Sequence, residues 1–237
     1  MTDMSKKIKI TLLFSIFFIL FSAFLVFFSN AQAASVPQFL VSWQASSYVP
    51  DWYRGKVFPS AGSKVSVGFD LVNNGKIVDL SKTAIRWYVN DNLIVNENNG
   101  LGIKNFTFIN NDVYGGNEID IRITLPNYNG GILDKTVAIP VKQPEVVVDA
   151  PYFGNKVSQG KNTLYAWPFF FNIKNIADLI YNWSVNGRGA TDANSPFLNL
   201  NVDLSTAPGS ILNLNAGIEN STNQIESANK TIQLEVK

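Results

Sequence analysis

Residues 87–90 read Trp-Tyr-Val-Asn, and residues 183–186 read Trp-Ser-Val-Asn, 96 positions later. A second motif repeats at nearly the same offset, because the segment KTVAIPV at 135–141 is echoed 95 positions later by KTIQLEV at 230–236. Gly62 has a counterpart in Gly160. Three landmarks at almost one offset indicate a duplicated unit, since unrelated strands would not keep this spacing.

Period-two alternation of apolar with polar or small residues runs through both copies. Four clear examples are residues 65–71, 119–125, 198–204 and 212–218. Such a strand buries one face and exposes the other to water. After Ser35, no segment of ten or more residues shows the three-and-four apolar spacing of a helix. Turn signals such as Asn-Gly separate the runs, so each copy is predicted to be an all-β sandwich or barrel.

We expect two domains, at residues 36–142 and 145–237, joined at Pro144. In the first domain the predicted strands cover residues 39–44, 64–72, 84–90, 103–110, 117–125 and 133–141. In the second domain they cover residues 145–149, 161–173, 179–186, 197–204, 210–219 and 230–236. Pro168 inside a strand indicates an edge or a bulge, because proline cannot donate to the ladder.

The first 33 residues predict a signal peptide or an N-terminal membrane anchor. Three lysines, at positions 6, 7 and 9, precede an uncharged apolar run at 10–28, and Ala31-Gln32-Ala33 forms a small-x-small cleavage site. The run is also long enough to span a bilayer as a helix, so an uncleaved anchor remains open. In both cases the lysines stay cytoplasmic and the rest is exported, to the exterior or the cell surface.

The composition excludes most familiar enzyme chemistries. The 237 residues include no His and no Cys, which removes imidazole bases, thiol nucleophiles, zinc or haem ligation by either residue, and disulfides. A formal net charge of +1 is too small for a general grip on nucleic acid. We therefore expect no nucleic-acid partner and no cofactor.

Acidic residues in or beside loops are the remaining candidates for metal binding or catalysis. Calcium binding needs several carboxylates, and solvated loop acids are the alternative interpretation. The acids in question are Asp91, Glu97, Asp112, Glu118 and Asp120. No spacing selects a calcium loop or a catalytic pair of carboxylates, so we expect neither a metal site nor an enzyme.

Trp87 and Trp183 carry a resemblance to a known family. A Trp in the third strand, one strand after a Gly-led strand, resembles immunoglobulin-like (Ig-like) sandwiches, and W-x-V-N is similar to bacterial Ig-like and polycystic-kidney-disease-type (PKD-like) repeats of exported proteins. The resemblance implies that both indoles fill the space between two sheets, as structural core. No cysteine pair brackets either Trp, and the sixth strands lack the Tyr of a tyrosine corner.

The segment at 43–56 departs from the repeat and concentrates aromatic and cationic residues. The candidate binding residues are Trp43, Tyr48, Trp52, Tyr53 and Arg54. Exposed, these side chains would stack on sugar rings or anchor a protein partner. In the alternative, Trp43 and Tyr48 pack under the first sandwich while Trp52 and Tyr53 cover a sheet edge.

A second aromatic cluster lies at residues 165–171. Phe169, Phe171 and Ile173 fit one buried face of a strand, which leaves Trp167 and Phe170 to pack at the junction with the first domain. A sticky strand edge that seeks a partner is the other interpretation.

Together these features predict a non-enzymatic, exported cell-envelope protein. Its tandem Ig-like domains would form a structural or adhesive spacer that contacts other envelope or surface proteins. The alternative is a carbohydrate-binding module that uses Trp52 and Tyr53 as a stacking platform for polysaccharide. Membrane contact is expected only through residues 10–28, if the N-terminal segment is not cleaved.

Overall fold

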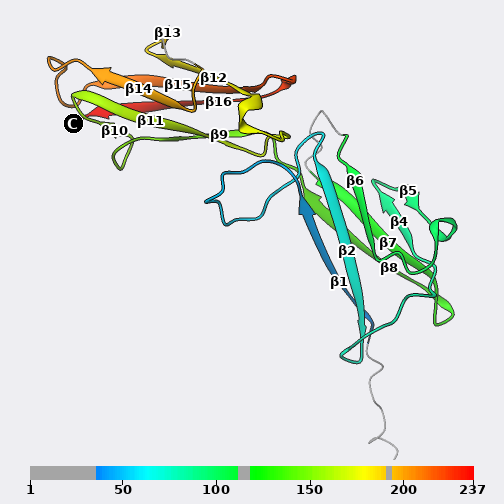
Figure 1. The fold of residues 1–237 in the computed structure, drawn as a ribbon. Coiled ribbons are helices and arrows are strands. Elements are labelled where there is room, and N and C mark those ends of the chain that lie inside the picture. Colours follow the sequence, from blue (N-terminus) through cyan, green and yellow to red (C-terminus); the bar gives the residue numbers. More distant parts are fainter. Residues whose placement is uncertain (1–35, 112–117, 191–193) are drawn as a thin grey trace, which may run out of the picture. The chain divides into compact units, whose positions relative to one another are not determined.

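A computed structural model describes residues 36–111, 118–190 and 194–237 (Figure 1). The predicted signal or anchor helix and the candidate ligand Asp112 lie outside the described residues. Within the described ranges, no helix has the length and apolar character needed to cross a membrane. The regular secondary structure of the described chain is almost all β-strand, with only two short 3₁₀ helices among the described residues, as the alternation predicted.

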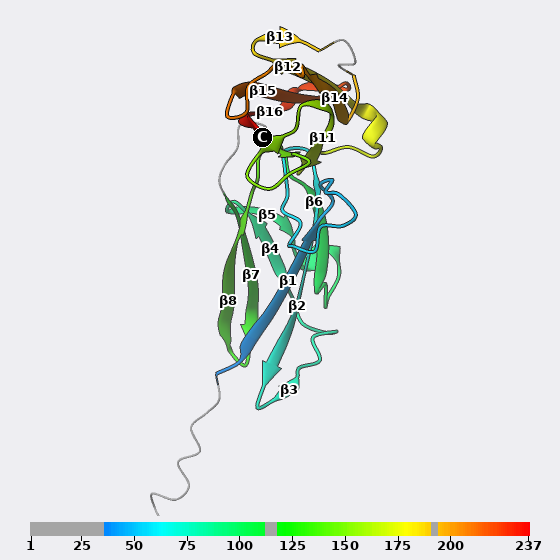
Figure 2. The same ribbon diagram turned by 90° about the vertical axis from the view of Figure 1, so that its left-hand side faces the viewer.

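The first sandwich is built from strands β1 to β8, arranged in two sheets. One sheet has the order β1-β2-β3 with β6 also paired to β2, and the other has the order β5-β4-β7-β8 (Figure 2). The strands are β1 (Gln38–Ala45), β2 (Lys64–Asn73), β3 (Lys76–Ile77), β4 (Arg86–Val89), β5 (Asn92–Val95), β6 (Asn105–Ile109), β7 (Glu118–Tyr128) and β8 (Gly131–Pro140). A short 3₁₀ helix, η1 (Glu97–Asn99), precedes β6.

The second sandwich is built from strands β9 to β16. Its sheets have the orders β14-β11-β9 and β10-β16-β15-β12-β13. The strands are β9 (Glu145–Asp149), β10 (Lys156–Val157), β11 (Gly160–Phe169), β12 (Leu179–Val185), β13 (Arg188–Gly189), β14 (Phe197–Val202), β15 (Ile211–Asn220) and β16 (Asn223–Val236), with a 3₁₀ helix η2 (Ile176–Asp178) before β12. β10 runs parallel to β16, and the other pairs are antiparallel.

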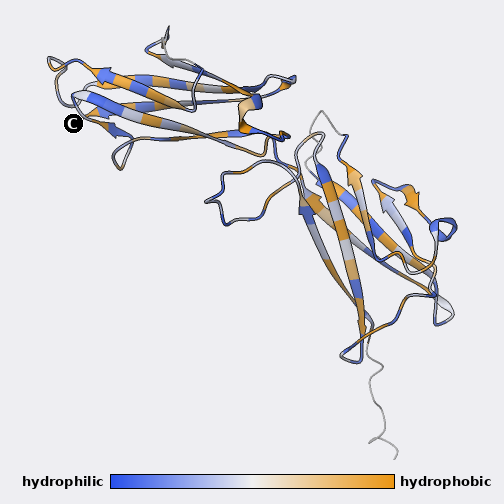
Figure 3. Cartoon of the chain, in the orientation of Figure 1, coloured by the Kyte–Doolittle hydropathy of each residue, from blue (hydrophilic) through white to orange (hydrophobic). Residues whose placement is uncertain are grey.

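Each sandwich encloses its own hydrophobic core. The first core contains the alternating residues predicted from the sequence, namely Val65, Val67, Phe69, Leu71, Ile119, Ile121, Ile123 and Leu125. The second core contains residues of both its sheets, from Val146 to Val236. Figure 3 shows the resulting alternation of hydrophobic and hydrophilic residues along the strands. The fold is thus two tandem Ig-like β-sandwiches.

The Trp of the W-x-V-N motif has the same structural role in both sandwiches. Trp87 is 0% exposed, and its indole N–H donates to the carbonyl oxygen of Ile103 at 2.7 Å. Trp183 is 2% exposed, and its indole N–H donates to the carbonyl oxygen of Ser195 at 2.9 Å. Each ring therefore fills the core and also satisfies its own donor.

The Asn that ends the motif also has one role in both copies. The side-chain oxygen of Asn90 accepts the backbone N–H of Asp120 at 2.9 Å, and that of Asn186 accepts the backbone N–H of Asn213 at 2.9 Å. Both Asn residues have positive φ, 47° and 49°. Asn tolerates this conformation better than most residues, which explains why the motif ends in Asn where the strand turns.

Four hairpins use two-residue turns in which both central residues have positive φ. These turns are Asn74-Gly75, Asn90-Asp91, Asn129-Gly130 and Asn186-Gly187. Type I′ turns need this conformation, and their twist matches that of the flanking strands. Three of the four follow the Asn-Gly signals in the sequence, whereas Asn90-Asp91 was missed and with it β5.

Some strand boundaries differ from the predictions. The short strands β3, β5, β10 and β13 were not predicted, and β16 begins at Asn223 rather than at residue 230. β14 ends at Val202, so Leu204, which was assigned to that strand, is 75% exposed in a loop. Short strands are held by their neighbours in the sheet, and two to four residues of sequence carry too little periodicity to reveal them.

Strand β11 changes the face that it buries near its end. Leu164 and Ala166 point into the second core, but after Phe170 it is Phe171 that is buried there. Phe170 has a φ of 60°, and this left-handed residue shifts the alternation by one position. The prediction that Phe169 shares a buried face with Phe171 and Ile173 is therefore wrong.

Candidate functional site

The segment that departs from the repeat forms a loop between β1 and β2, residues 46–63, and its base is fixed by two serines. The hydroxyl groups of Ser47 and Ser60 lie 3.0 Å apart, and the backbone N–H of Ser60 donates to the Ser47 hydroxyl at 3.0 Å. The backbone N–H of Lys142 donates to the carbonyl oxygen of Pro59 at 2.9 Å. The loop is therefore a closed, ordered structure rather than a free tether.

Tyr48 leaves the first sandwich and packs against the core of the second. Its backbone N–H donates to the carbonyl oxygen of Phe171 at 2.6 Å, and the N–H of Phe170 donates to the Tyr48 carbonyl oxygen at 2.7 Å. The two residues form an isolated antiparallel bridge. The interpretation that Tyr48 packs under the first sandwich is wrong, because this backbone pairing directs it to residues more than 120 positions away. Burial raises the pKa of its phenol.

Trp43 lies on β1, partly buried against the first core. The Lys56 ammonium lies 3.9 Å from the centroid of the indole and donates a hydrogen bond to the Trp43 carbonyl oxygen. Phe58 contacts the same ring at a centroid distance of 6.0 Å. Because Lys56 lies over its face and Phe58 contacts it, the Trp43 ring has a packing role and leaves little of its surface available to a ligand.

Trp52 and Tyr53 contact the aromatic residues at the end of β11. The Trp52 ring meets Trp167 and Phe169 edge to face, with centroids 5.7 Å and 5.8 Å apart. Tyr53 meets Phe169 in the same way at 5.4 Å. Tyr53 is partly buried, whereas Trp52 remains 52% exposed. Of the proposed stacking pair, only Trp52 is available to a ligand.

Arg54 is exposed beside these rings. Its guanidinium donates to the carbonyl oxygen of Asp51 at 2.9 Å, so the side chain folds back on its own loop. The five candidate residues therefore divide: Trp43 and Tyr48 pack against two different cores, Tyr53 covers β11, and Trp52 and Arg54 face solvent.

The outer face of β11 carries a row of aromatic side chains that continues from Trp52. Trp167 stacks on Tyr165 with centroids 5.7 Å apart and an interplanar angle of 14°, and Tyr165 contacts Phe197 of β14 at 6.3 Å. Tyr165 and Phe197 are each 41% exposed. We call these four residues, Trp52, Trp167, Tyr165 and Phe197, the aromatic row. Its members come from the loop and from the second sandwich.

Phe197 was not identified from the sequence as a site residue, although a signal was present. It stands directly before the alternating apolar residues of β14, out of phase with Leu198, which is buried. An aromatic residue on the solvent-exposed face of a strand is a candidate for contact with a ligand or a partner. Pairing of Tyr165 with Phe197 across the sheet could not be read from one strand alone.

Pro168 stands where one side of β11 has lost its partner. β14 pairs with β11 only as far as Tyr165, whereas β9 continues to Phe169. Pro168 therefore lies on a local edge, which is the position that a residue without an N–H tolerates.

The loop acids that the structure describes do not gather into a site. Among the described residues, no three acidic side chains lie close enough to hold a metal ion. Glu97 instead forms a bidentate pair with Arg86, with N···O distances of 2.6 Å and 2.9 Å, and Asp91 pairs with Arg122 at 3.3 Å.

The Arg86–Glu97 pair predicts a measurable acid dependence of stability. The hydrogen bonds from Arg86 lower the pKa of Glu97 to about 2, from an ordinary value of 4.5. Because the folded-state pKa is the lower one, the pair stabilises the fold above about pH 4.5, and this contribution is lost as the pH falls towards 2. We expect Glu97→Gln to flatten the decline of the melting temperature over this range. An unchanged acid limb in the variant would exclude the pair as its cause.

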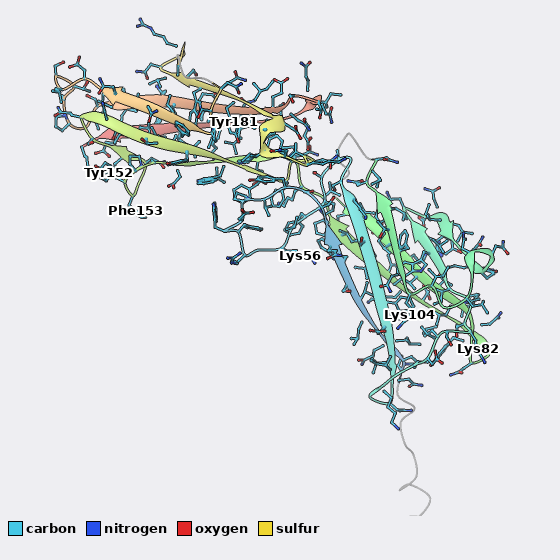
Figure 4. The ribbon with its side chains drawn as sticks, in the orientation of Figure 1. Lys56, Lys82, Lys104, Tyr152, Phe153 and Tyr181 are labelled. Carbon is cyan, nitrogen blue, oxygen red and sulfur yellow. The ribbon has the colours of Figure 1, made fainter. Side chains whose placement is uncertain are left out.

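Tyr181 carries a buried polar atom without a partner. The residue lies in the core of the second sandwich (Figure 4), and its hydroxyl makes no hydrogen bond to any described residue. Burial, with Tyr48 nearby, raises its pKa to about 12. We expect Tyr181→Phe to be neutral or to stabilise the fold by up to about 1 kcal/mol, because an unpaired buried hydroxyl is costly. Urea denaturation measures this change; a loss above about 1 kcal/mol would mean that the hydroxyl has a partner.

Two surface hollows occur in the first sandwich, and neither has the chemistry of an active site. One, of about 410 Å³, lies over β1, β2 and β6 and is lined by three residues from each, at 42–44, 66–68 and 105–107. The other, of about 560 Å³, is lined by residues 89, 90, 92, 94, 108–111 and 119. Neither lining contains a carboxylate, lysine, arginine or tyrosine side chain. General acid–base catalysis has no group to work with in these two places.

Comparison with known proteins identifies similar folds only. No protein-family model matches the chain, and no curated protein matches it. Among solved structures, it is similar to three N-terminal domains of the Highly Immunogenic Outer Capsid protein (Hoc) of bacteriophage RB49, at 11% identity and a TM-score of 0.40. That match covers 84% of this chain and 59% of the other.

Two further matches have lower scores. SGBP-B of the Bacteroides ovatus mixed-linkage glucan utilization locus, in complex with a mixed-linkage heptasaccharide, matches at 13% identity and a TM-score of 0.25, over 86% of this chain and 48% of its own. The Ig1-2 module of the Drosophila receptor phosphatase DLAR matches at 12% identity and 0.28, over 86% and 100%. The chain spans about half of the first two structures. At these scores the matches carry no argument about function.

Proposed function

We propose that the chain is a non-enzymatic, exported protein of a bacterial-type cell envelope, in which two Ig-like modules, at residues 36–142 and 145–237, serve as a structural or adhesive spacer. The modules make contacts with other envelope or surface proteins. The observation that carries the proposal is the set of contacts made by the loop at 46–63, where the repeat is broken. Its Tyr and Trp side chains and backbone contact other protein residues, namely Phe171, Trp167 and Phe169.

The distribution of ionisable groups supports a role in contact rather than in catalysis. The closest ion pairs each join one acid to one base on a surface, as in Lys104 with Asp70 at 2.6 Å. The two hollows have no ionisable lining. Open sheet edges remain for partner strands, for example along β8, the outermost strand of its sheet.

Crosslinking in intact cells tests the proposed contacts. A photoreactive residue at Ile132, exposed on the edge strand β8, should give a discrete crosslinked product with an envelope protein. The same residue at Asp134 of β8, also exposed, is a second position on this edge. Absence of products from both positions would exclude the β8 edge as the contact surface. In a separate assay, hydrolysis of any polymer that is abolished by a single Asp or Glu substitution would show that the protein is an enzyme and would overturn the proposal.

Export and processing have their own test. Protease added to intact cells should digest the protein, because the modules are proposed to lie outside the membrane. Sequencing of the N-terminus should begin at Ala34 if the signal is cleaved after Ala33. Protection from the protease would contradict export, and an intact N-terminus would favour the anchor.

A further inference from the structure

We propose that the outer face of the sheet β14-β11-β9, together with Trp52, is a binding site for a strand of neutral polysaccharide. This proposal is independent of the protein contacts above. Of the Trp52–Tyr53 pair predicted from the sequence to bind carbohydrate, this site keeps only Trp52, because Tyr53 is covered by Phe169 and Phe170. The ligand instead meets the aromatic row and the polar residues beside it.

The aromatic row supplies apolar surface of an unusual kind for an exposed sheet. Tyr165 and Trp167 stand two positions apart on one face of β11, and Phe197 is the cross-strand partner of Tyr165. Trp52 extends the row past the point where pairing with β14 has ended. Sugar rings present C–H groups that pack on aromatic rings, and four rings in succession suit a chain of sugars better than a single one.

Amide and hydroxyl side chains continue the same face. Thr163 pairs across the sheet with Asn199, and its hydroxyl donates to the Asn199 side-chain oxygen at 3.2 Å. The amide nitrogen of Asn199 donates no hydrogen bond to the described residues, so both of its hydrogens are available to a ligand. Asn201 follows on β14, also exposed. These groups both donate and accept, as sugar hydroxyls require.

The charge on this face selects against charged polymers. Of the residues that the three strands direct outward, one is a cation, Lys161, and two are acids, Glu145 and Asp149. An anionic polymer would need a cluster of cations. A ligand that alternates apolar faces with hydroxyl edges, and carries no charge, is the best chemical complement to rings followed by amides.

Affinity electrophoresis and tryptophan fluorescence of the full chain in mild detergent test the site. The probes are cellohexaose, laminarin, soluble mannan and xylan, with polygalacturonate as the anionic comparison. We expect at least one neutral probe to bind and to change the fluorescence. Tyr165→Ala and Trp167→Ala should each weaken that binding roughly tenfold, and Trp52→Ala should weaken it less.

Phe153 provides the matched control. It is fully exposed at the tip of the loop between β9 and β10 (Figure 4), so Phe153→Ala removes an aromatic ring without touching the row, and binding should be unchanged. Melting temperatures verify that the variants fold. If Trp167→Ala does not fold, the Tyr165→Ala variant, which changes an exposed residue, still tests the site. The proposal is overturned if no neutral probe binds, if the Tyr165 and Trp167 variants bind as well as the parent, or if polygalacturonate binds best.

Discussion

Replacing Trp183 with alanine is expected to destabilise the second sandwich by about 3–5 kcal/mol. The ring is 2% exposed within the core, so its removal leaves a large cavity. It also leaves the carbonyl oxygen of Ser195 without its donor. Urea denaturation followed by far-ultraviolet circular dichroism measures the loss, which is a large part of the stability of a typical domain.

Trp87→Ala should have an effect of the same size on the first sandwich. This ring is 0% exposed, contacts Phe69 and Phe106, and donates to Ile103. Trp→Phe at either position keeps most of the buried area but loses the N–H donor, so a smaller loss of roughly 1–3 kcal/mol is expected. A loss below about 1 kcal/mol for either alanine variant would contradict the shared role of the two indoles.

Glu226→Ala is expected to cost roughly 2–4 kcal/mol. Glu226 is a buried carboxylate on β16 that accepts the backbone N–H of Asn172 and, at 2.6 Å, the side-chain amide of Asn220. Asn220 is itself 2% exposed. Removal of the carboxylate leaves both donors without an acceptor and detaches the β15–β16 hairpin from the segment that follows Phe171.

Glu235→Ala is the matched control for this prediction. Glu235 lies on the same strand, but its side chain is 44% exposed and pairs with Lys156 at 3.4 Å. An exposed pair of this length contributes within about 1 kcal/mol. Denaturation midpoints of the two variants should therefore differ clearly. Equal midpoints would show that the burial of Glu226 has no energetic consequence.

Much of the fold was predictable because it depends on neighbours in the sequence. The alternating residues of β2 and β7 were assigned correctly to the core, and the Asn-Gly turns appeared where the hairpins reverse. Errors began where a local rule was overridden. Phe169 faces away from the core by the regular alternation of β11, and Phe170, in a left-handed conformation, shifts the alternation so that Phe171 enters the core.

The candidate site was predictable in composition but not in arrangement. The sequence predicted that Trp167 and Phe170 pack at the junction with the first domain, and they do contact its loop at 46–63. It did not identify Trp52 as the partner of Trp167. Trp52 meets Trp167 across more than 100 positions, and Phe197 joins them only through pairing of β14 with β11. Contacts of this kind depend on strand order and register, which one strand does not encode.

The amino-acid sequence by itself determined the β-class of this protein, its duplication and its turns, because backbone preference and period-two burial act over a few residues. Only the tertiary structure decided that Tyr48 packs on the second core and that four aromatic rings form one exposed row. The physical reason is that burial and ring contact are properties of surfaces, and surfaces here are assembled from strands and a loop that are distant in the chain.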